Sequence, residues 1–299
     1  MNSFHFRSAT VADFPQIARL IIEQNQDPAR QCLHSGDRYE NTLNTMVKYS
    51  EAGEFCLVIA VQDERIVTIL GSEFEESLSR GWLWGPFSLT EASDMVLPEL
   101  FQALRGLLPA TITRLDGYLN IENKNGVQFY QENGFYQSDL VHVYIAPRPQ
   151  TDFSLIQPCD VLSSQHASSF RALFQLIFPH TFETGQSILS KIDEDHKVFV
   201  EATQDQVFGY LYGYVEDDEG SGYIEYVGVQ PEARNQGIGR RLLLTALKWF
   251  FDERGLPEVA LTVNDKLANA RSLYESVGFQ LTYTGVNMRK SEEAHHPSS

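Results

Sequence analysis

The sequence predicts an α/β protein (α+β, mixed sheets) made of two tandem domains, each a mostly antiparallel mixed sheet flanked by helices. Three observations predict this fold. A short motif occurs twice, the same order of expected strands and helices runs twice along the chain, and a proline-containing linker separates the two runs. The expected domains are 1–146 and 152–290, and a polar tail covers 291–299.

The repeated motif combines an asparagine, a tyrosine and a Gly-Phe pair. In the first half it reads Asn125, Tyr130, Gly134 and Phe135, and 144 positions later it reads Asn269, Tyr274, Gly278 and Phe279. Upstream, the stretch 82–85 aligns with 225–228 at an offset of 143. A nearly constant offset over that span indicates two copies of one domain.

The first half is expected to begin with a strand and two helices. Thr10 is a plausible N-cap for a helix over 11–24, whose apolar residues recur at helical spacing, and Pro98 lies near a helix start, where proline is tolerated. The expected elements are a strand at 4–8, helices at 11–24 and 40–51, strands at 55–61, 65–73 and 81–89, a helix at 94–108, a strand at 115–121, a helix at 125–132 and a strand at 135–145.

The second half repeats that order after the linker 147–151, whose two prolines stop the preceding strand. Hairpins come early and one strand-helix-strand crossover comes late. The expected elements are a strand at 154–157, helices at 164–178 and 182–192, strands at 198–202, 207–215 and 223–229, a helix at 237–253, a strand at 259–263, a helix at 269–276 and a strand at 281–288.

Composition narrows the functional class. The chain has 299 residues, and its formal net charge of −17 disfavours nucleic acid and anionic membranes as partners, although it could attract a cationic amine. The sequence shows neither an apolar run of membrane-spanning length nor a signal-peptide pattern. Its three cysteines are widely spaced, so we expect no disulfide framework, no metal site and a cytoplasmic location.

A glycine-bearing loop before an amphipathic helix is the most informative stretch. Arg234, Gly237 and Gly239 follow the expected strand 223–229 and precede an apolar helix. A helix N-terminus offers free N–H groups to an anion, and glycine lets the backbone approach it closely. A Gly-x-Gly pair alone could simply tighten a turn, but the whole order favours a phosphate-binding loop.

This stretch resembles the Gcn5-related N-acetyltransferase (GNAT) superfamily. The family signature Arg/Gln-x-x-Gly-x-Gly/Ala, followed by an asparagine-containing loop and Tyr-x-x-x-Gly-Phe, is matched by Arg234, Gly237, Gly239, Asn269 and Tyr274. The resemblance covers about 152–290 well and about 1–146 more weakly. It implies that acetyl-CoA lies in a splay between the strands that end near 229 and begin near 259.

The resemblance also implies roles for single residues. Main-chain groups of Val227 and Val229 would bind the pantetheine as if it were an added strand. Tyr274 would protonate the departing thiolate, and either Asn269 or Asn264 would contact the cofactor arm, because Leu267 stands where the family often has asparagine. The pyrophosphate would be held by the loop residues Arg234, Asn235, Gln236, Gly237, Ile238, Gly239 and Arg240.

The expected chemistry is direct attack of a neutral amine on the thioester. Glu225 is the candidate base, because strand alternation should put it on the face of Val227 and Val229. It could instead be a solvated strand residue, and Tyr274 could instead be a packed core tyrosine.

The first copy lacks the phosphate loop. Its corresponding segment contains Pro86, Glu91 and Asp94, which remove an N–H donor and add negative charge, and Trp82 stands where the second copy has Glu225. We therefore expect a degenerate domain that shapes the acceptor pocket or stabilises the pair.

The predicted function is transfer of an acetyl or other acyl group from CoA to a small-molecule or peptide amine, in the C-terminal domain. The alternatives are a non-catalytic acyl-CoA-binding regulatory module and a tandem acyltransferase similar to mycothiol synthase. The sequence identifies neither the acceptor nor the oligomeric state.

Overall fold

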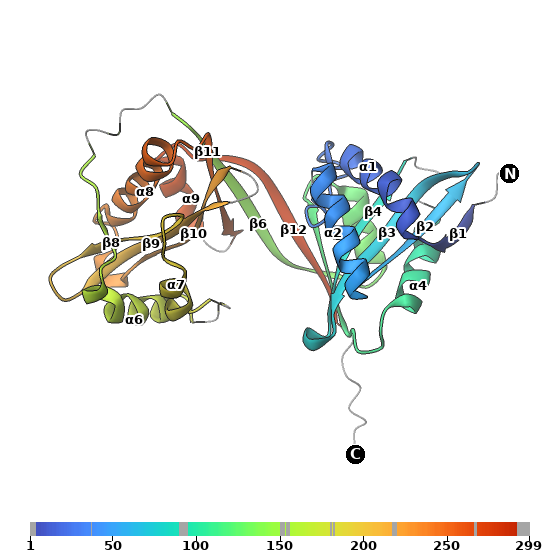
Figure 1. Cartoon of the computed structure of the whole chain (residues 1–299), viewed down its shortest axis with the longest axis horizontal. Helices are drawn as coiled ribbons and strands as arrows, with labels where there is room; N and C mark the ends of the chain where they lie inside the picture. Colours follow the sequence, from blue (N-terminus) through green and yellow to red (C-terminus); the bar gives the residue numbers. More distant parts are fainter. Residues whose placement is uncertain are drawn as a thin grey trace, which may run out of the picture. The chain divides into compact units, whose positions relative to one another are not determined.

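The computed structural model describes residues 4–36, 38–89, 95–149, 153, 156–179, 181, 183–216, 220–265 and 268–291. By its contacts the chain divides into two compact units (Figure 1). Unit 1 contains Met1–Val141 and Thr284–Ser299, and unit 2 contains His142–Tyr283. The end of the chain from Thr284 thus belongs to unit 1, whereas the sequence assigned residues up to 290 to the second domain. The expected domain boundaries at 146 and 152 stay a prediction.

Unit 1 contains a sheet in the order β1-β2-β3-β4-β5-β12. Its neighbouring strands are antiparallel except β4 and β5, which pair in parallel. Its elements are β1 (His5–Ser8), η1 (Val11–Asp13), α1 (Phe14–Asn25), α2 (Tyr39–Ala52), β2 (Phe55–Gln62), β3 (Arg65–Glu75), η2 (Glu76–Leu78), β4 (Arg80–Ser88), α4 (Leu97–Leu107), β5 (Arg114–Asn120), α5 (Lys124–Glu132) and the first part of β6 (Tyr136–Pro147).

Unit 2 contains a sheet in the order β6-β11-β10-β9-β8-β7, in which β10 and β11 are parallel. Its remaining elements are β7 (Asp160–Val161), η4 (Ser164–His166), α6 (Ala167–Ile177), α7 (Gly185–Lys191), β8 (His196–Ala202), β9 (Val207–Glu216), β10 (Ser221–Val229), η5 (Pro231–Ala233), α8 (Ile238–Lys248), the π-helical turn η6 (Trp249–Glu253), β11 (Glu258–Asn264), α9 (Ala268–Glu275) and β12 (Gln280–Ser291), which continues into unit 1.

The expected fold class is confirmed: both halves run through the same order of strands and helices. One expected strand is wrong. Ile156 and Gln157 are not in a strand, and the first two residues of the expected 154–157 segment lie outside the described residues. Pro158 has no N–H, and the N–H of Cys159 donates to Thr245 Oγ1 at 2.9 Å, so the strand forms only at β7.

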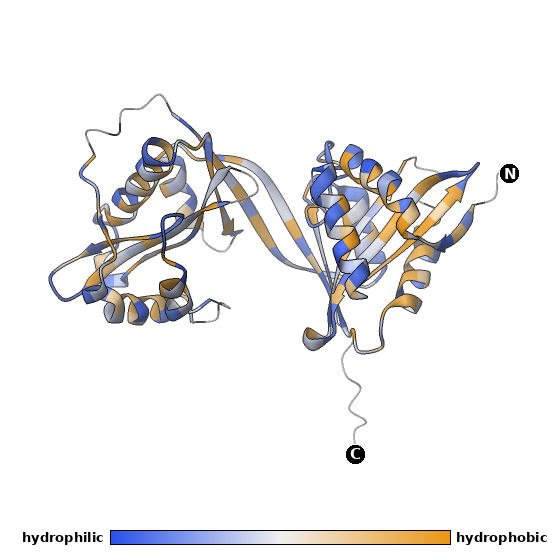
Figure 2. Ribbon diagram, in the orientation of Figure 1, coloured by the Kyte–Doolittle hydropathy of each residue, from blue (hydrophilic) through white to orange (hydrophobic). Residues whose placement is uncertain are grey.

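Each unit has its own apolar core. In unit 2, α8 and α6 cover opposite faces of the strands β8–β10 (Figure 1), and apolar residues line the sides of these helices that face the sheet (Figure 2). Leu211 and Ile224 pack on the α8 side, whereas Tyr210 and Tyr226 pack on the α6 side. Among the described residues, no helix is both long and apolar enough to cross a membrane.

Candidate active site

Strands β10 and β11 pair only over their first residues. Gly222–Ile224 pairs with Val259–Leu261, but β10 runs on to Val229 and β11 runs on to Asn264. We call the space beyond Ile224 and Leu261 the donor gap. It lies where the resemblance puts the acyl donor.

The backbone of β10 turns polar groups toward the donor gap. The N–H of Gln230 donates to Phe208 O of β9 at 2.7 Å, so this residue points its polar groups at β9. Because backbone polar groups alternate between the two edges of a strand, those of Val227 and Val229 point to the opposite edge. These two residues can therefore bind an extended ligand by main-chain hydrogen bonds, as the sequence predicts.

The loop after β10 ends in an open helix N-terminus. Asn235 and Gly237 have positive φ angles of 62° and 78°, and at Gly237 a residue with a side chain would be strained. The first intrahelical bond of α8 runs from Arg241 N to Gly237 O at 3.0 Å. The N–H groups of residues 238–240 therefore have no acceptor within the helix, and they remain available to an anion.

Gly239 brings three elements together at this helix start. A Cβ at Gly239 would lie 3.0 Å from Leu273 Cδ2 of α9 and 3.9 Å from Val229 Cγ2 of β10. Glycine thus allows α9 to approach the end of the donor gap closely. Tyr274, the next residue of α9, packs against the same apolar core as Val229.

The arginines of the loop have different surroundings. Arg241 pairs with Glu201 of β8 at 2.7 Å and donates to Gln236 O at 3.2 Å. Arg234 is exposed, and its Nε donates to Val229 O at 3.2 Å, while Arg240 is also exposed. Sequence reasoning missed Glu201, because it is 40 positions from its partner and belongs to no motif.

Tyr274 lies on α9 with a half-buried side chain. Its ring centroid is 6.3 Å from that of Tyr144 and 6.1 Å from that of Phe279. Burial raises the pKa of Tyr274 to about 12, so the hydroxyl is protonated at neutral pH. A protonated hydroxyl is the form that a general acid requires.

The structure does not decide between Asn264 and Asn269 as the residue that contacts the cofactor arm. Asn264 is the half-buried last residue of β11, and Asn269 lies in the first turn of α9, outside the side chains that the structure describes. Leu267 also lies outside the described residues. Both asparagines border the connection from β11 to α9, so either remains a candidate for the cofactor arm.

Glu225 does not share a face with Val227 and Val229, and that expectation is wrong. The register of β10 against β9 shifts between Ile224 and Tyr226, which makes Glu225 the extra residue of a bulge. As a result Ile224, Val227 and Val229 pack on the α8 side, whereas Tyr226 packs on the α6 side.

The surroundings of Glu225 are aromatic and acidic. Its carboxylate accepts a hydrogen bond of 3.5 Å from the hydroxyl of Tyr214, which packs on the α6 side of the sheet. Burial raises the pKa of Glu225, the Tyr214 hydrogen bond opposes this, and the charges of Glu183 and Glu216 raise the pKa further. A carboxylate with a raised pKa is better suited to accept a proton than an ordinary surface glutamate.

A group of tyrosines around Glu225 was missed from the sequence. Tyr212 and Tyr214 lie on β9, and Tyr223 and Tyr226 lie on β10. The alternation of tyrosine at 210, 212 and 214 is a period-two signal that could have indicated an aromatic sheet face.

In unit 1 the corresponding gap is filled by the chain itself. Strands β4 and β5 pair only between Arg80–Trp82 and Arg114–Asp116. Beyond these pairs, Gln31–Leu33, here called the plug segment, bonds to β5 as a short antiparallel strand. Leu33 N donates to Tyr118 O at 2.9 Å, and Asn120 N donates to Gln31 O at 3.1 Å.

Buried side chains fix the plug segment. Cys32 is fully buried, and its Sγ lies 3.4 Å from the N atom of Gly85 on β4. Its N–H donates to Asn25 Oδ1 at 2.9 Å. Tyr130, the counterpart of Tyr274, is also fully buried and donates to Gly85 O at 2.6 Å. The units therefore differ in the plug segment as well as in the predicted loss of the loop residues. Of those loop residues, Glu91 and Asp94 lie outside the described residues.

The C-terminal half matches one known family model. Residues 167–279 match the sequence model of the Acetyltransferase (GNAT) family. This match covers the strands β8–β11, the loop at the start of α8 and the Tyr274 motif. The resemblance seen in the sequence is therefore confirmed for this part of the chain.

Relatives of known name match only part of the chain. A mycothiol acetyltransferase from Salinispora arenicola is 34% identical over 90 residues, which are 28% of this chain and 29% of that relative. The chain thus matches less than a third of the length of that protein.

Solved structures match nearly the whole chain in fold. A GCN5-related N-acetyltransferase from Sphaerobacter thermophilus has a TM-score of 0.67 at 20% identity, covering 96% of this chain and 95% of that chain. A tandem GNAT protein from the clavulanic acid biosynthesis pathway has a TM-score of 0.59 at 10% identity, covering 97% and 98%. At these identities the likenesses show the fold alone, and they extend over both units of the chain.

Proposed function

We propose that this chain is an acyl-CoA-dependent N-acyltransferase with its donor site in unit 2. The observation that carries the proposal is the continuity of the donor gap with the open start of α8. Main-chain groups of Val227 and Val229 that point away from β9 lead along β10 to the available N–H groups of residues 238–240, and Arg234 already bonds to Val229 O. The GNAT match over 167–279 supports the same assignment.

Acetyl-CoA fits this site as the acyl donor substrate. The pantetheine arm lies along Val227 and Val229 as an added strand, and the pyrophosphate accepts hydrogen bonds from the amides of residues 235–240. The exposed side chains of Arg234 and Arg240 supply positive charge, whereas that of Arg241 is neutralised by Glu201. Asn269 or Asn264 contacts the arm.

The reaction is a direct transfer. Glu225 takes the proton of the acceptor ammonium, directly or through a water molecule, and the free amine attacks the thioester carbon. The N–C bond forms, and the N–H of Val227 stabilises the oxyanion. The C–S bond then breaks, and Tyr274 gives its proton to the leaving thiolate. The acceptor nitrogen loses its remaining extra proton, which returns through water to the Tyr274 oxygen. Because Glu225 lies on the opposite face from Val227, proton relay through water suits the geometry better than direct contact.

The acceptor is a small-molecule or peptide amine. The acidic and aromatic surroundings of Glu225 favour a substrate that arrives as a cation. The mycothiol acetyltransferase relatives support, as a second candidate, a tandem enzyme similar to mycothiol synthase. A cytoplasmic location, and the lack of a nucleic-acid or membrane partner, belong to the same proposal.

A turnover screen tests the function. Release of free CoA thiol from acetyl-CoA is measured with amines, polyamines, aminoglycosides and peptides, for the wild type and for Tyr274→Phe. We expect acceptor-dependent release that the variant largely loses. Tight acetyl-CoA binding without release for any acceptor would support the non-catalytic regulatory module instead.

A further inference from the structure

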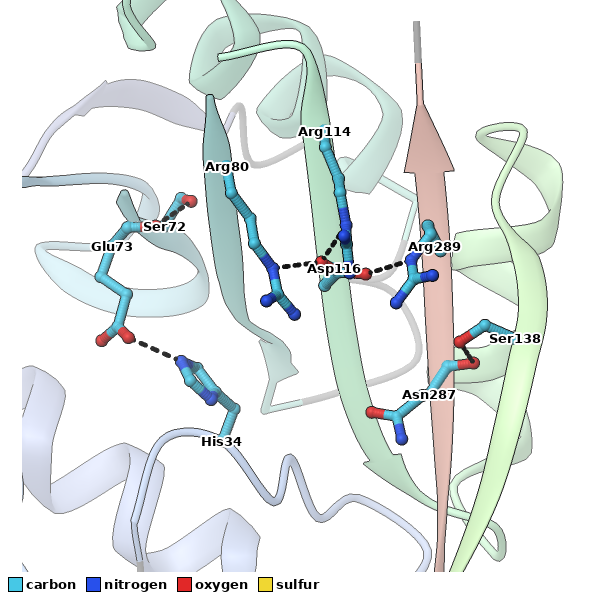
Figure 3. A network of polar contacts seen from close by, with 9 residues as sticks. All are labelled: His34, Ser72, Glu73, Arg80, Arg114, Asp116, Ser138, Asn287 and Arg289. Carbon is cyan, nitrogen blue, oxygen red and sulfur yellow. Dashed lines mark hydrogen bonds and ion pairs between the residues drawn. The ribbon is translucent and has the colours of Figure 1, made fainter. Parts of the chain in front are cut away.

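Three arginines of unit 1 converge on a single carboxylate. Asp116 of β5 accepts hydrogen bonds from Nε of Arg80 at 2.6 Å, of Arg114 at 2.7 Å and of Arg289 at 2.8 Å (Figure 3). Burial works to raise the pKa of Asp116, but hydrogen bonds from Arg289 and Arg114 outweigh it, so the pKa is lowered and the carboxyl is ionised. We call these four residues the arginine cluster.

The sheet register itself creates the cluster. Arg80 lies opposite Arg114 in the parallel pair β4–β5, and Asp116 lies opposite Arg289 in the antiparallel pair β5–β12. Like charges directly opposite each other in a sheet are destabilising. In unit 2 the corresponding pairs, Gly222–Ile224 with Val259–Leu261, contain no arginine. The fold of the repeat therefore does not require this arrangement.

The cluster has an excess of positive charge. Within the part of the chain that the structure describes, the ion pairs of its three arginines are all made with Asp116. The four residues of the cluster alone have a formal charge of about +2, in a chain whose net charge is −17. Two acids of β3 border the cluster: Glu75 lies opposite Arg80, and Glu73 lies opposite Trp82. Glu73 contacts His34 and Trp84, and Glu75 accepts from Ser77.

The guanidinium groups are placed to bind a further anion. Each uses Nε for Asp116, Arg289 also has a side-chain hydrogen bond with Tyr136, and each arginine side chain is 30–33% exposed. Figure 3 shows the terminal nitrogens of Arg80 and Arg289 turned to the same side, one on each flank of Asp116. Paired guanidinium nitrogens match the oxygens of a phosphate group.

An aromatic wall adjoins the cluster. The guanidinium of Arg80 lies 4.5 Å from the centroid of the Trp82 ring, and the His34 ring stacks on the same indole at 6.4 Å. An anion with a flat apolar group could therefore contact both the guanidinium groups and the indole.

We propose that the arginine cluster of unit 1 is a binding site for a phosphate dianion, such as a phosphate monoester. The paired guanidinium nitrogens match the oxygens of the ligand, and Trp82 gives a surface for the body of an ester. This site is separate from the donor gap of unit 2 and is independent of the proposed acyl transfer.

The test is calorimetric titration of the full-length chain with inorganic phosphate and with phenyl phosphate. Arg80→Gln and Arg289→Gln are each expected to weaken phosphate binding about tenfold, since each removes a charge-assisted contact. Arg65→Gln, which changes an exposed arginine on β3, is the matched control and should bind as the wild type does. Equal binding by the control and the cluster variants would overturn the proposal.

Two further variants separate the possible explanations. Arg234→Gln reports on phosphate bound at the donor loop, and if this variant alone loses binding, the site belongs to unit 2 and the proposal fails. Asp116→Asn removes the competing carboxylate, so phosphate should bind about tenfold more tightly and raise Tm more than in the wild type. Unchanged or weaker binding by Asp116→Asn would show that the arginines serve only to stabilise the sheet.

Discussion

The two units have the same strand order but treat the same gap in opposite ways. In unit 2, β10 continues past its last pair with β11, and we propose that a ligand bonds to its main-chain groups there. In unit 1, β4 continues past its last pair with β5, and Gln31–Leu33 bonds there in place of a ligand. The comparison teaches that an unpaired strand edge must be satisfied, either by a substrate or by the chain itself.

The two equivalent tyrosines follow the same contrast. Tyr130 is fully buried, and its hydroxyl is bonded to the backbone of β4. Tyr274 is only half-buried, and it lies on the helix that packs against the start of α8. The tyrosine of the motif thus holds α5 to β4 in unit 1, and in unit 2 it is the proposed general acid.

Gly237→Glu should weaken acetyl-CoA binding roughly 100-fold or more, because a carboxylate would face the pyrophosphate and the side chain would strain a φ of 78°. Gly255→Glu is the matched control, since Gly255 has a φ of 72° in the same unit and a Cβ there meets no atom within 4 Å. Binding measured by calorimetry should be lost in the first variant and kept in the second. An equal loss in both would attribute the effect to backbone strain.

Tyr274→Phe should lower kcat by roughly 100-fold or more while leaving the Kd for acetyl-CoA nearly unchanged, because its proton is needed only when sulfur leaves. Tyr130→Phe is the control from unit 1 and should leave kcat unchanged. It should instead lower the free energy of unfolding by about 1 kcal/mol, through loss of the buried hydrogen bond to Gly85. Wild-type turnover by Tyr274→Phe would assign Tyr274 to the core.

Glu225→Gln should shift the pH profile of kcat/KM toward higher pH, where more of the acceptor is already a free amine. Burial raises the folded-state pKa of Glu225, so this group favours the folded state at low pH and loses that contribution as pH rises through its pKa. The glutamine variant should therefore be slightly more stable than the wild type near pH 7. An unchanged pH profile would remove Glu225 from the proposed mechanism.

Asn25→Ala should loosen the plug segment, because its side chain accepts from Cys32 N and donates to Cys32 O. The expected cost is about 1–3 kcal/mol of unfolding free energy, with little change in acetyl-CoA affinity. Denaturant unfolding and calorimetry of the same sample check both parts. A second acetyl-CoA site appearing in this variant would show that the plug alone keeps unit 1 empty.

Much of this was predictable from local sequence. The repeated motif indicated two units, and the order of Arg234, Gly237 and Gly239 indicated a loop before a helix, which the structure has. The plug segment, the bulge at Glu225 and the Arg241–Glu201 pair were not predicted. Each depends on hydrogen bonds or register between strands far apart in the sequence, and no local periodicity records them.

The most direct test of the account is the stoichiometry of acetyl-CoA binding to the full-length chain. Calorimetric titration of the wild type should give one equivalent per chain, since within the described residues unit 2 alone combines the donor gap with the proposed phosphate loop. Two equivalents per chain, or one equivalent that survives Gly237→Glu, would contradict the division between the two units.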